Sequence, residues 1–195
     1  PGFEGVPVEV RQPRNMWADG AEDIDPETGY ATIRSNAQNR YVPNFSYGKG
    51  KIVWNFESVN MPAGTDGFLY LNGDTWHWNG AANGAGWIQI RIYPQDSTTK
   101  SSFKLHYDWT AEEFTLEESM NDIKTIELDT KVDPEDATKV NVTFSINGKV
   151  YYSGKKHNAF DLDGHKGVIF YSGFSGPFSP ECTIVFKSLD YEVYE

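Results

Sequence analysis

The chain has 195 residues, a formal net charge of −11, and aromatic side chains at 15% of its positions. A chain of this length buries a full core without needing disulfides or metals, and its acidic balance argues against nucleic acids and anionic membrane surfaces as main partners, because both attract patches of Lys and Arg. Cys182 is the single cysteine, so we expect no disulfide within the chain and no metal site built from cysteines.

Apolar residues recur with a period of two along most of the chain, which predicts half-buried strands rather than helices. The alternation and the turn signals predict strands over 6–10, 30–35, 51–59, 67–73, 87–94, 102–109, 125–129, 139–146, 166–174 and 183–194. Asn147-Gly148 separates two apolar runs and predicts a two-residue type I′ hairpin. The segment 110–123 is the one helix candidate, and its apolar residues are too sparse for more than a turn.

This many short strands, separated by turns, predicts an all-β fold in which two antiparallel sheets form a sandwich. The sequence contains no internal repeat, no low-complexity segment and no linker, so we expect residues 1–195 to form one domain. No stretch is apolar enough over the length of a membrane-spanning helix. The acidic composition is common among secreted proteins, and we expect a secreted or cell-surface protein.

The C-terminal half resembles the concanavalin A-like lectin and glucanase superfamily, whose jelly roll occurs in laminin-G-like domains, carbohydrate-binding modules, laminarinases and alginate lyases. The resemblance covers roughly residues 87–195 and is carried by "KVNVTFSINGKVYYSG", "GHKGVIFYSGFSG" and "CTIVFKSLDYEVYE". They have the order typical of that fold: a tight hairpin, a strand that opens with glycine, and a last strand that returns to the centre of its sheet. The resemblance implies that a concave sheet holds carbohydrate.

The strongest candidate site is the outward face of residues 87–94 and 102–109. If these strands pair as a hairpin, their isoleucines and Phe103 enter the core. The opposite face then collects aromatic rings and planar hydrogen-bonding groups, namely Trp87, Gln89, Arg91, Tyr93, Lys104, His106 and Asp108. Sugar rings stack on aromatic faces while their hydroxyls bond to such planar groups, so this composition suits a glycan. The alternative interpretation is a solvated outer face, with the stems of Arg and Lys lying on the sheet.

Trp76 and Trp78 lie before this strand in a turn rich in glycine and asparagine. Their equal parity would place both indoles on one side if the segment were extended. We therefore interpret them either as a stacking platform at the rim of the site or as caps of the core edge.

The same face allows an enzymatic alternative. Alginate-lyase-type enzymes, which this chain resembles in fold, carry a Gln-Ile-His motif on one strand, and Gln89-Ile90-Arg91 stands where that motif would be. The resemblance then implies that Gln89 and Arg91 neutralise a uronate carboxylate, that His106 removes the C5 proton, and that Tyr93 protonates the leaving oxygen. The Arg-x-Glu-x-Arg and Tyr-Phe-Lys-Ala-Gly segments of those enzymes are absent from the sequence. A lyase is more consistent with the sequence than a glycoside hydrolase, because no strand carries a suitable carboxylate pair.

An acidic segment near the N-terminus is the only candidate metal site. Its carboxylates are hard oxygen ligands of the kind that calcium prefers, and they are Asp19, Asp23, Asp25 and Glu27. Their spacing does not match an EF-hand loop, and a solvated acidic loop is the simpler interpretation.

The sequence thus predicts a protein that binds a polysaccharide or oligosaccharide through an aromatic and polar sheet face. A polysaccharide lyase acting on a uronic-acid-containing glycan is the first alternative, and an adhesive or structural sandwich without a glycan ligand is the second. Structural calcium is the one cofactor that the residues suggest, and none is required. Other domains of a larger glycan-degrading protein are partners consistent with this prediction.

Overall fold

The computed structural model describes residues 23–34, 38–45, 48–62, 65, 67–74, 87–105, 108–158, 168–175 and 182–194. For several strand residues, among them Trp87 and Asp108, the backbone alone is described. The predicted strand 6–10 lies outside the described residues.

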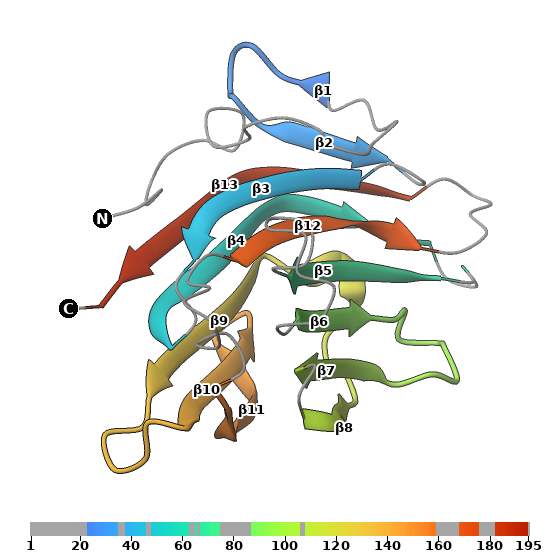
Figure 1. The fold of residues 1–195 in the computed structure, drawn as a ribbon. Coiled ribbons are helices and arrows are strands. Elements are labelled where there is room, and N and C mark those ends of the chain that lie inside the picture. The colour runs from blue at the N-terminus through green and yellow to red at the C-terminus, as the bar shows by residue number, and fades with distance from the viewer. Residues whose placement is uncertain are drawn as a thin grey trace.

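The described strands form two antiparallel sheets that pack face to face, and their strand orders run in the same direction, from β1 and β3 to β11 and β8 (Figure 1). The seven-stranded sheet contains, in spatial order, β1 (Asp23–Ile24), β2 (Ala31–Arg34), β13 (Thr183–Val193), β4 (Lys49–Asn60), β9 (Thr125–Val132), β10 (Lys139–Ile146) and β11 (Lys149–His157). The six-stranded sheet contains β3 (Gln38–Phe45), β12 (Val168–Ser175), β5 (Phe68–Asp74), β6 (Trp87–Ile92), β7 (Ser101–Leu105) and β8 (Asp108–Phe114). This arrangement confirms the predicted all-β sandwich, and β13 returns to the interior of its sheet as expected.

The core lies between the two sheets because each strand turns its apolar set to the same side. On β4, Ile52 and Trp54 are buried while the intervening Val53 is partly exposed. Phe103 of the six-stranded sheet stacks on Phe144 of the seven-stranded sheet, with ring centroids 5.6 Å apart and an interplanar angle of 4°. The predicted inward faces are therefore confirmed wherever their side chains are described.

The turn between β10 and β11 is the predicted type I′ hairpin, with φ values of 49° at Asn147 and 78° at Gly148. The side chain of Asn147 also ties this turn to the segment before β9. Its Oδ1 accepts from the backbone N–H groups of Lys124 at 2.7 Å and Thr125 at 3.0 Å, and its Nδ2 donates to the Asp122 carbonyl at 2.9 Å.

Two sequence predictions need correction. Residues 102–109 do not form one strand, because β7 ends at Leu105 and β8 begins at Asp108, whose backbone lies opposite Leu105. β3 was not among the predicted strands, and its Pro43 lacks a backbone donor. It is an edge strand of its sheet, where a proline is tolerated.

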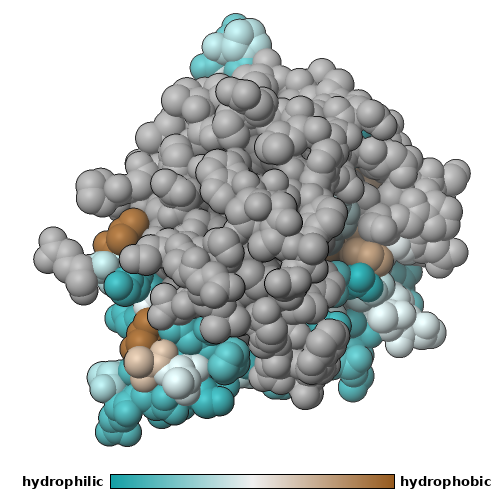
Figure 2. All heavy atoms as spheres, viewed as in Figure 1, coloured by the Kyte–Doolittle hydropathy of each residue, from teal (hydrophilic) through white to brown (hydrophobic). Residues whose placement is uncertain are grey.

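The helix candidate is confirmed as no more than a turn. Residues 108–114 are strand, and one turn of 3₁₀ helix follows at Met120–Asp122 (η1). Within the described ranges, no helix has the length and apolar character that crossing a membrane requires. In the view of Figure 2, the described surface over β9–β11, at the lower left, is mainly hydrophilic.

Candidate functional site

β6 presents Gln89 and Arg91 on the side of its sheet that faces away from the core. Its three isoleucines, Ile88, Ile90 and Ile92, are fully buried, whereas Gln89 and Arg91 are partly exposed. Alternation along a strand requires this division once the isoleucines enter the core. The predicted pairing of β6 with β7 is confirmed, with Gln89 in register with Lys104 and Arg91 in register with Ser102.

The guanidinium of Arg91 is held by two neighbours. The amide oxygen of Gln89, oriented so that it faces the guanidinium, accepts from Nη2 at 2.9 Å and from Nε at 3.2 Å. The guanidinium carbon lies 4.7 Å from the centre of the Phe68 ring, a cation–π contact. The remaining N–H groups of Arg91 have no partner among the described residues. Because Gln89 and Phe68 hold the guanidinium in place, these N–H groups have a fixed direction and can donate to a ligand.

Phe68 also gathers the aromatic residues of the site. Its ring centre lies 5.0 Å from that of Tyr93 and 6.4 Å from that of Tyr70. Tyr93 follows the end of β6, where its backbone N–H donates to the hydroxyl of the buried Ser101 at 3.2 Å. A cation, an amide and the two partly exposed rings of Phe68 and Tyr93 thus lie close together on β5, on β6 and just after β6, whereas the Tyr70 ring beside them is buried.

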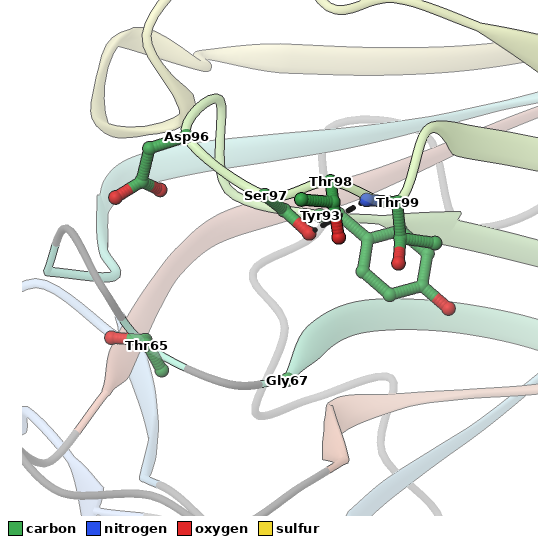
Figure 3. A pocket seen from close by; sticks show the side chains of 7 residues that line it. All are labelled: Thr65, Gly67, Tyr93, Asp96, Ser97, Thr98 and Thr99. Atoms are coloured by element: carbon green, nitrogen blue, oxygen red, sulfur yellow. Dashed lines mark hydrogen bonds between the residues drawn. The ribbon is translucent and has the colours of Figure 1, made fainter.

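A pocket of about 300 Å³, partly open to solvent, adjoins Tyr93 (Figure 3). Its lining combines hydroxyl groups with one carboxylate and one glycine, and consists of Thr65, Gly67, Tyr93, Asp96, Ser97, Thr98 and Thr99. The Thr99 backbone N–H donates to the Ser97 hydroxyl at 3.1 Å, and the buried Thr65 hydroxyl donates to the Pro62 carbonyl at 2.5 Å. We call this cavity the hydroxyl pocket.

The structure brings three of the predicted site residues together, namely Gln89, Arg91 and Tyr93. The backbone of Trp87 lies opposite Asp74 on β5. Asp108 belongs to β8, where its backbone lies opposite Leu105, and not to the same strand as Lys104 as predicted. Trp76, Trp78 and His106 lie outside the described residues, so their roles remain predictions.

The predicted calcium ligands are described only in part. Asp25 accepts a hydrogen bond from the backbone N–H of Glu27 at 2.8 Å, and this bond lowers the pKa of its carboxyl group. Both side chains are exposed. Asp19 lies outside the described residues, and Asp23 is described by its backbone alone. Among the described side chains, no three His, Cys, Asp or Glu residues group as metal ligands would.

Sequence reasoning missed the hydroxyl pocket and Phe68. The sequence predicts a turn over 94–101, and the structure agrees closely, since β6 ends at Ile92 and β7 begins at Ser101. The sequence signal for this pocket was the run of Ser97, Thr98 and Thr99, because a turn does not require three successive hydroxyl side chains. Nothing in the sequence indicates that Thr65 and Gly67 form the facing wall.

No protein-family model matches this sequence, and no curated protein matches it either. Solved structures do resemble it in fold. A Bacteroides ovatus GH16 protein of a mixed linkage glucan PUL, in complex with its product, has a TM-score of 0.63 and 11% identity, over 89% of this chain and 85% of that chain. The carbohydrate recognition domain of Emp46p has a TM-score of 0.60 and 12% identity, over 91% and 88% of the two chains.

The alginate lyase Aly36B, in complex with alginate trisaccharide, has a TM-score of 0.54 and 10% identity, over 91% of this chain and 88% of that chain. At identities of 10–12%, structural similarity is evidence for the fold alone. Each similarity extends over most of both chains, and it agrees with the two sheets and the interior position of β13. The chain therefore has the concanavalin A-like jelly-roll fold.

Proposed function

We propose that the protein binds a polysaccharide or oligosaccharide on the outward face of β5 and β6 and in the adjoining hydroxyl pocket. The observation that carries the proposal is the guanidinium of Arg91, held between Gln89 and Phe68 on a partly exposed sheet face. A group fixed in this way loses little conformational freedom on binding, so its remaining donors are preorganised for a hydroxyl or carboxylate of the ligand.

The rest of the site suits sugars for chemical reasons. The rings of Phe68 and Tyr93 offer apolar surface to sugar C–H groups, and the hydroxyl pocket offers both donors and acceptors. The similar structures described with a glucan product and an alginate trisaccharide support the proposal by analogy of fold. We further propose that the protein acts outside the cell or at its surface, consistent with its net charge of −11.

Calorimetric titration with a panel of neutral β-glucans and uronic acid polymers tests the proposal. We expect at least one of them to bind, and we expect Arg91→Lys to weaken that binding about tenfold, because Lys provides neither the bidentate fork nor the planar stack. The matched control is Arg34→Lys on β2 of the other sheet, which should bind like the wild type. If no polymer binds, or if both variants behave alike, the assigned site is wrong.

The position of Tyr93 favours one second candidate function, a polysaccharide lyase. Phe68 contacts both Arg91 and Tyr93, which places a cation for the uronate carboxylate beside a phenol that could protonate the leaving oxygen. A base must also remove the C5 proton so that the C4–C5 double bond forms, and the predicted base His106 lies outside the described residues. Incubation with alginate should then increase the ultraviolet absorbance of the unsaturated product, and a flat signal on every uronic acid polymer contradicts this function.

A further inference from the structure

A second pocket of about 190 Å³ adjoins the hydroxyl pocket, and Asp96 lines both. The lining of this second pocket combines two methionines and a proline with amide groups, and consists of Met61, Pro94, Gln95, Asp96, Ser119, Met120 and Asn121. We call it the amide pocket. Figure 3 shows Asp96 and Tyr93 on opposite sides of Ser97, and Asp96 also lines the amide pocket.

A fixed turn separates the two pockets. The backbone N–H of Ser97 donates to the Pro94 carbonyl at 2.9 Å and closes the turn, which places Asp96 at its third position. The side chain of Gln95 anchors the turn from the other side, since its Nε2 donates to the Glu117 carbonyl at 3.0 Å. The ridge between the pockets is therefore part of the folded framework, and a ligand that uses both pockets must cross it.

The amide pocket has a floor and a rim of different chemistry. Met61 and Met120 are only 3% and 2% exposed and form an apolar floor. At the rim, Asn121 Oδ1 accepts from the Met61 backbone N–H at 2.9 Å, which leaves the Nδ2 donors without a partner among the described residues. The hydrogen bond from Gln95 Nε2 to Glu117 likewise leaves the Gln95 Oε1 acceptor without a partner among the described residues. An apolar floor with one donor and one acceptor matches the C–H face and the hydroxyl edge of a sugar ring.

We propose that the two pockets are consecutive subsites for a neutral oligosaccharide that crosses the turn at Asp96. This inference rests on the proposed function, because it takes glycan binding as given and specifies the length and charge of the glycan. Neither pocket exceeds the small end of the range of about 300–1,000 Å³ that is usual for ligand sites, so a ligand gains by using both. Among the residues that line them, no side chain is cationic and the one ionisable carboxylate is that of Asp96, so the lining holds no group that would pair with a uronate.

The length requirement is tested with cello-oligosaccharides and laminari-oligosaccharides, from glucose to the hexasaccharide, titrated against the full chain. We expect affinity to rise about tenfold or more between the shortest ligand that binds and the tetrasaccharide, and then to level off. An affinity that does not change with length overturns the two-subsite inference and leaves the proposed function intact. Failure of all oligosaccharides in both series, together with failure of the polysaccharide panel, overturns both.

The placement of the second subsite is tested with Asn121→Asp. This variant keeps the Oδ1 acceptor for the Met61 N–H and hence the local fold, but it replaces the donor that faces the pocket with a negative charge. For the wild type, affinity should rise from the shortest ligand that binds to the tetrasaccharide. We expect Asn121→Asp to remove most of this rise in affinity and to leave the affinity of the shortest ligand unchanged. Asn141→Asp, an exposed position on β10, is the matched control and should preserve the full gain. Equal chain-length profiles for the two variants overturn the placement.

The charge preference is tested with Asp96→Asn and alginate oligosaccharides of the same lengths. Removal of the carboxylate should raise the affinity for these anionic oligosaccharides several-fold relative to the wild type and change the affinity for the neutral series less. A wild type that prefers the anionic series, or an Asp96→Asn variant that shows no relative gain for it, overturns the inference that this part of the site is neutral. Thermal unfolding of each variant, compared with the wild type, establishes that the protein is folded.

Discussion

The guanidinium of Arg91 lies 4.7 Å above the ring of Phe68, on the neighbouring strand. Phe68 is partly exposed and opens β5, and the pairing of β5 with β6 brings it beside Arg91. The contact fixes the guanidinium against the sheet, where Arg91 is partly exposed. Phe68 is thus a positioning residue for the proposed site.

Replacement of Phe68 by leucine should weaken glycan binding about two- to fivefold, because a cation–π contact contributes about 0.5–1 kcal/mol at a partly exposed site and leucine keeps only the apolar bulk. Calorimetric titration of the variant with the polymer that the wild type binds measures this loss. Phe114→Leu is the control: it removes a ring that packs on Phe144 in the core and should lower stability without changing affinity. Unchanged affinity in Phe68→Leu would show that Arg91 needs no aromatic support.

Tyr93→Phe should separate the two proposed functions. The ring stays in contact with Phe68, so a binding protein loses only the hydrogen bond of the phenol, about 1 kcal/mol or a roughly fivefold weaker affinity. A lyase that uses this hydroxyl as its acid should instead lose about a hundredfold or more in turnover, with its KM little changed. Tyr30→Phe, on the segment before β2, is the matched control and should be neutral in both assays.

Asn147→Ala should lower the free energy of unfolding by about 2–3 kcal/mol, because it removes three hydrogen bonds and places a Cβ-bearing residue without a local polar partner at positive φ. Urea unfolding at constant m-value measures the change. Asn147→Gly accepts the positive φ but also lacks the side chain, so the difference between the two variants isolates the backbone contribution. If Asn147→Gly is as stable as the wild type, the side-chain bonds to Lys124, Thr125 and Asp122 contribute nothing.

The stability of the protein should fall as pH rises above 10, in part through Tyr151. Burial, together with a hydrogen bond to Glu118, raises the pKa of Tyr151 from 10.0 to about 12. A raised pKa means that the fold favours the neutral phenol, so this contribution is complete below pH 10 and is lost as pH approaches 12. Tyr151→Phe should flatten part of the decline in unfolding free energy over this window, whereas Tyr30→Phe should follow the wild-type curve.

Much of the candidate site could be predicted from local pattern. The isoleucines of β6 alternate with Gln89 and Arg91, and an apolar set that must enter a core forces the intervening residues outward. The same reasoning yielded the β6–β7 pairing and its register. It failed over 102–109, where alternation continues in the sequence although β7 ends at Leu105 and β8 begins at Asp108. A period-two pattern does not reveal where one strand ends and the next begins.

The sequence by itself determined the fold class, the tight turn at Asn147-Gly148 and the outward position of Gln89 and Arg91, because each follows from the conformational preferences of neighbouring residues. Tertiary structure decided the rest of the site. It brought Phe68 beneath Arg91, set Thr65 and Gly67 opposite the Pro94–Ser97 turn, and placed Asn121 beside Met61. These contacts depend on which strands become neighbours and how their connecting segments meet. That outcome reflects the burial of the whole core, and no local pattern contains it.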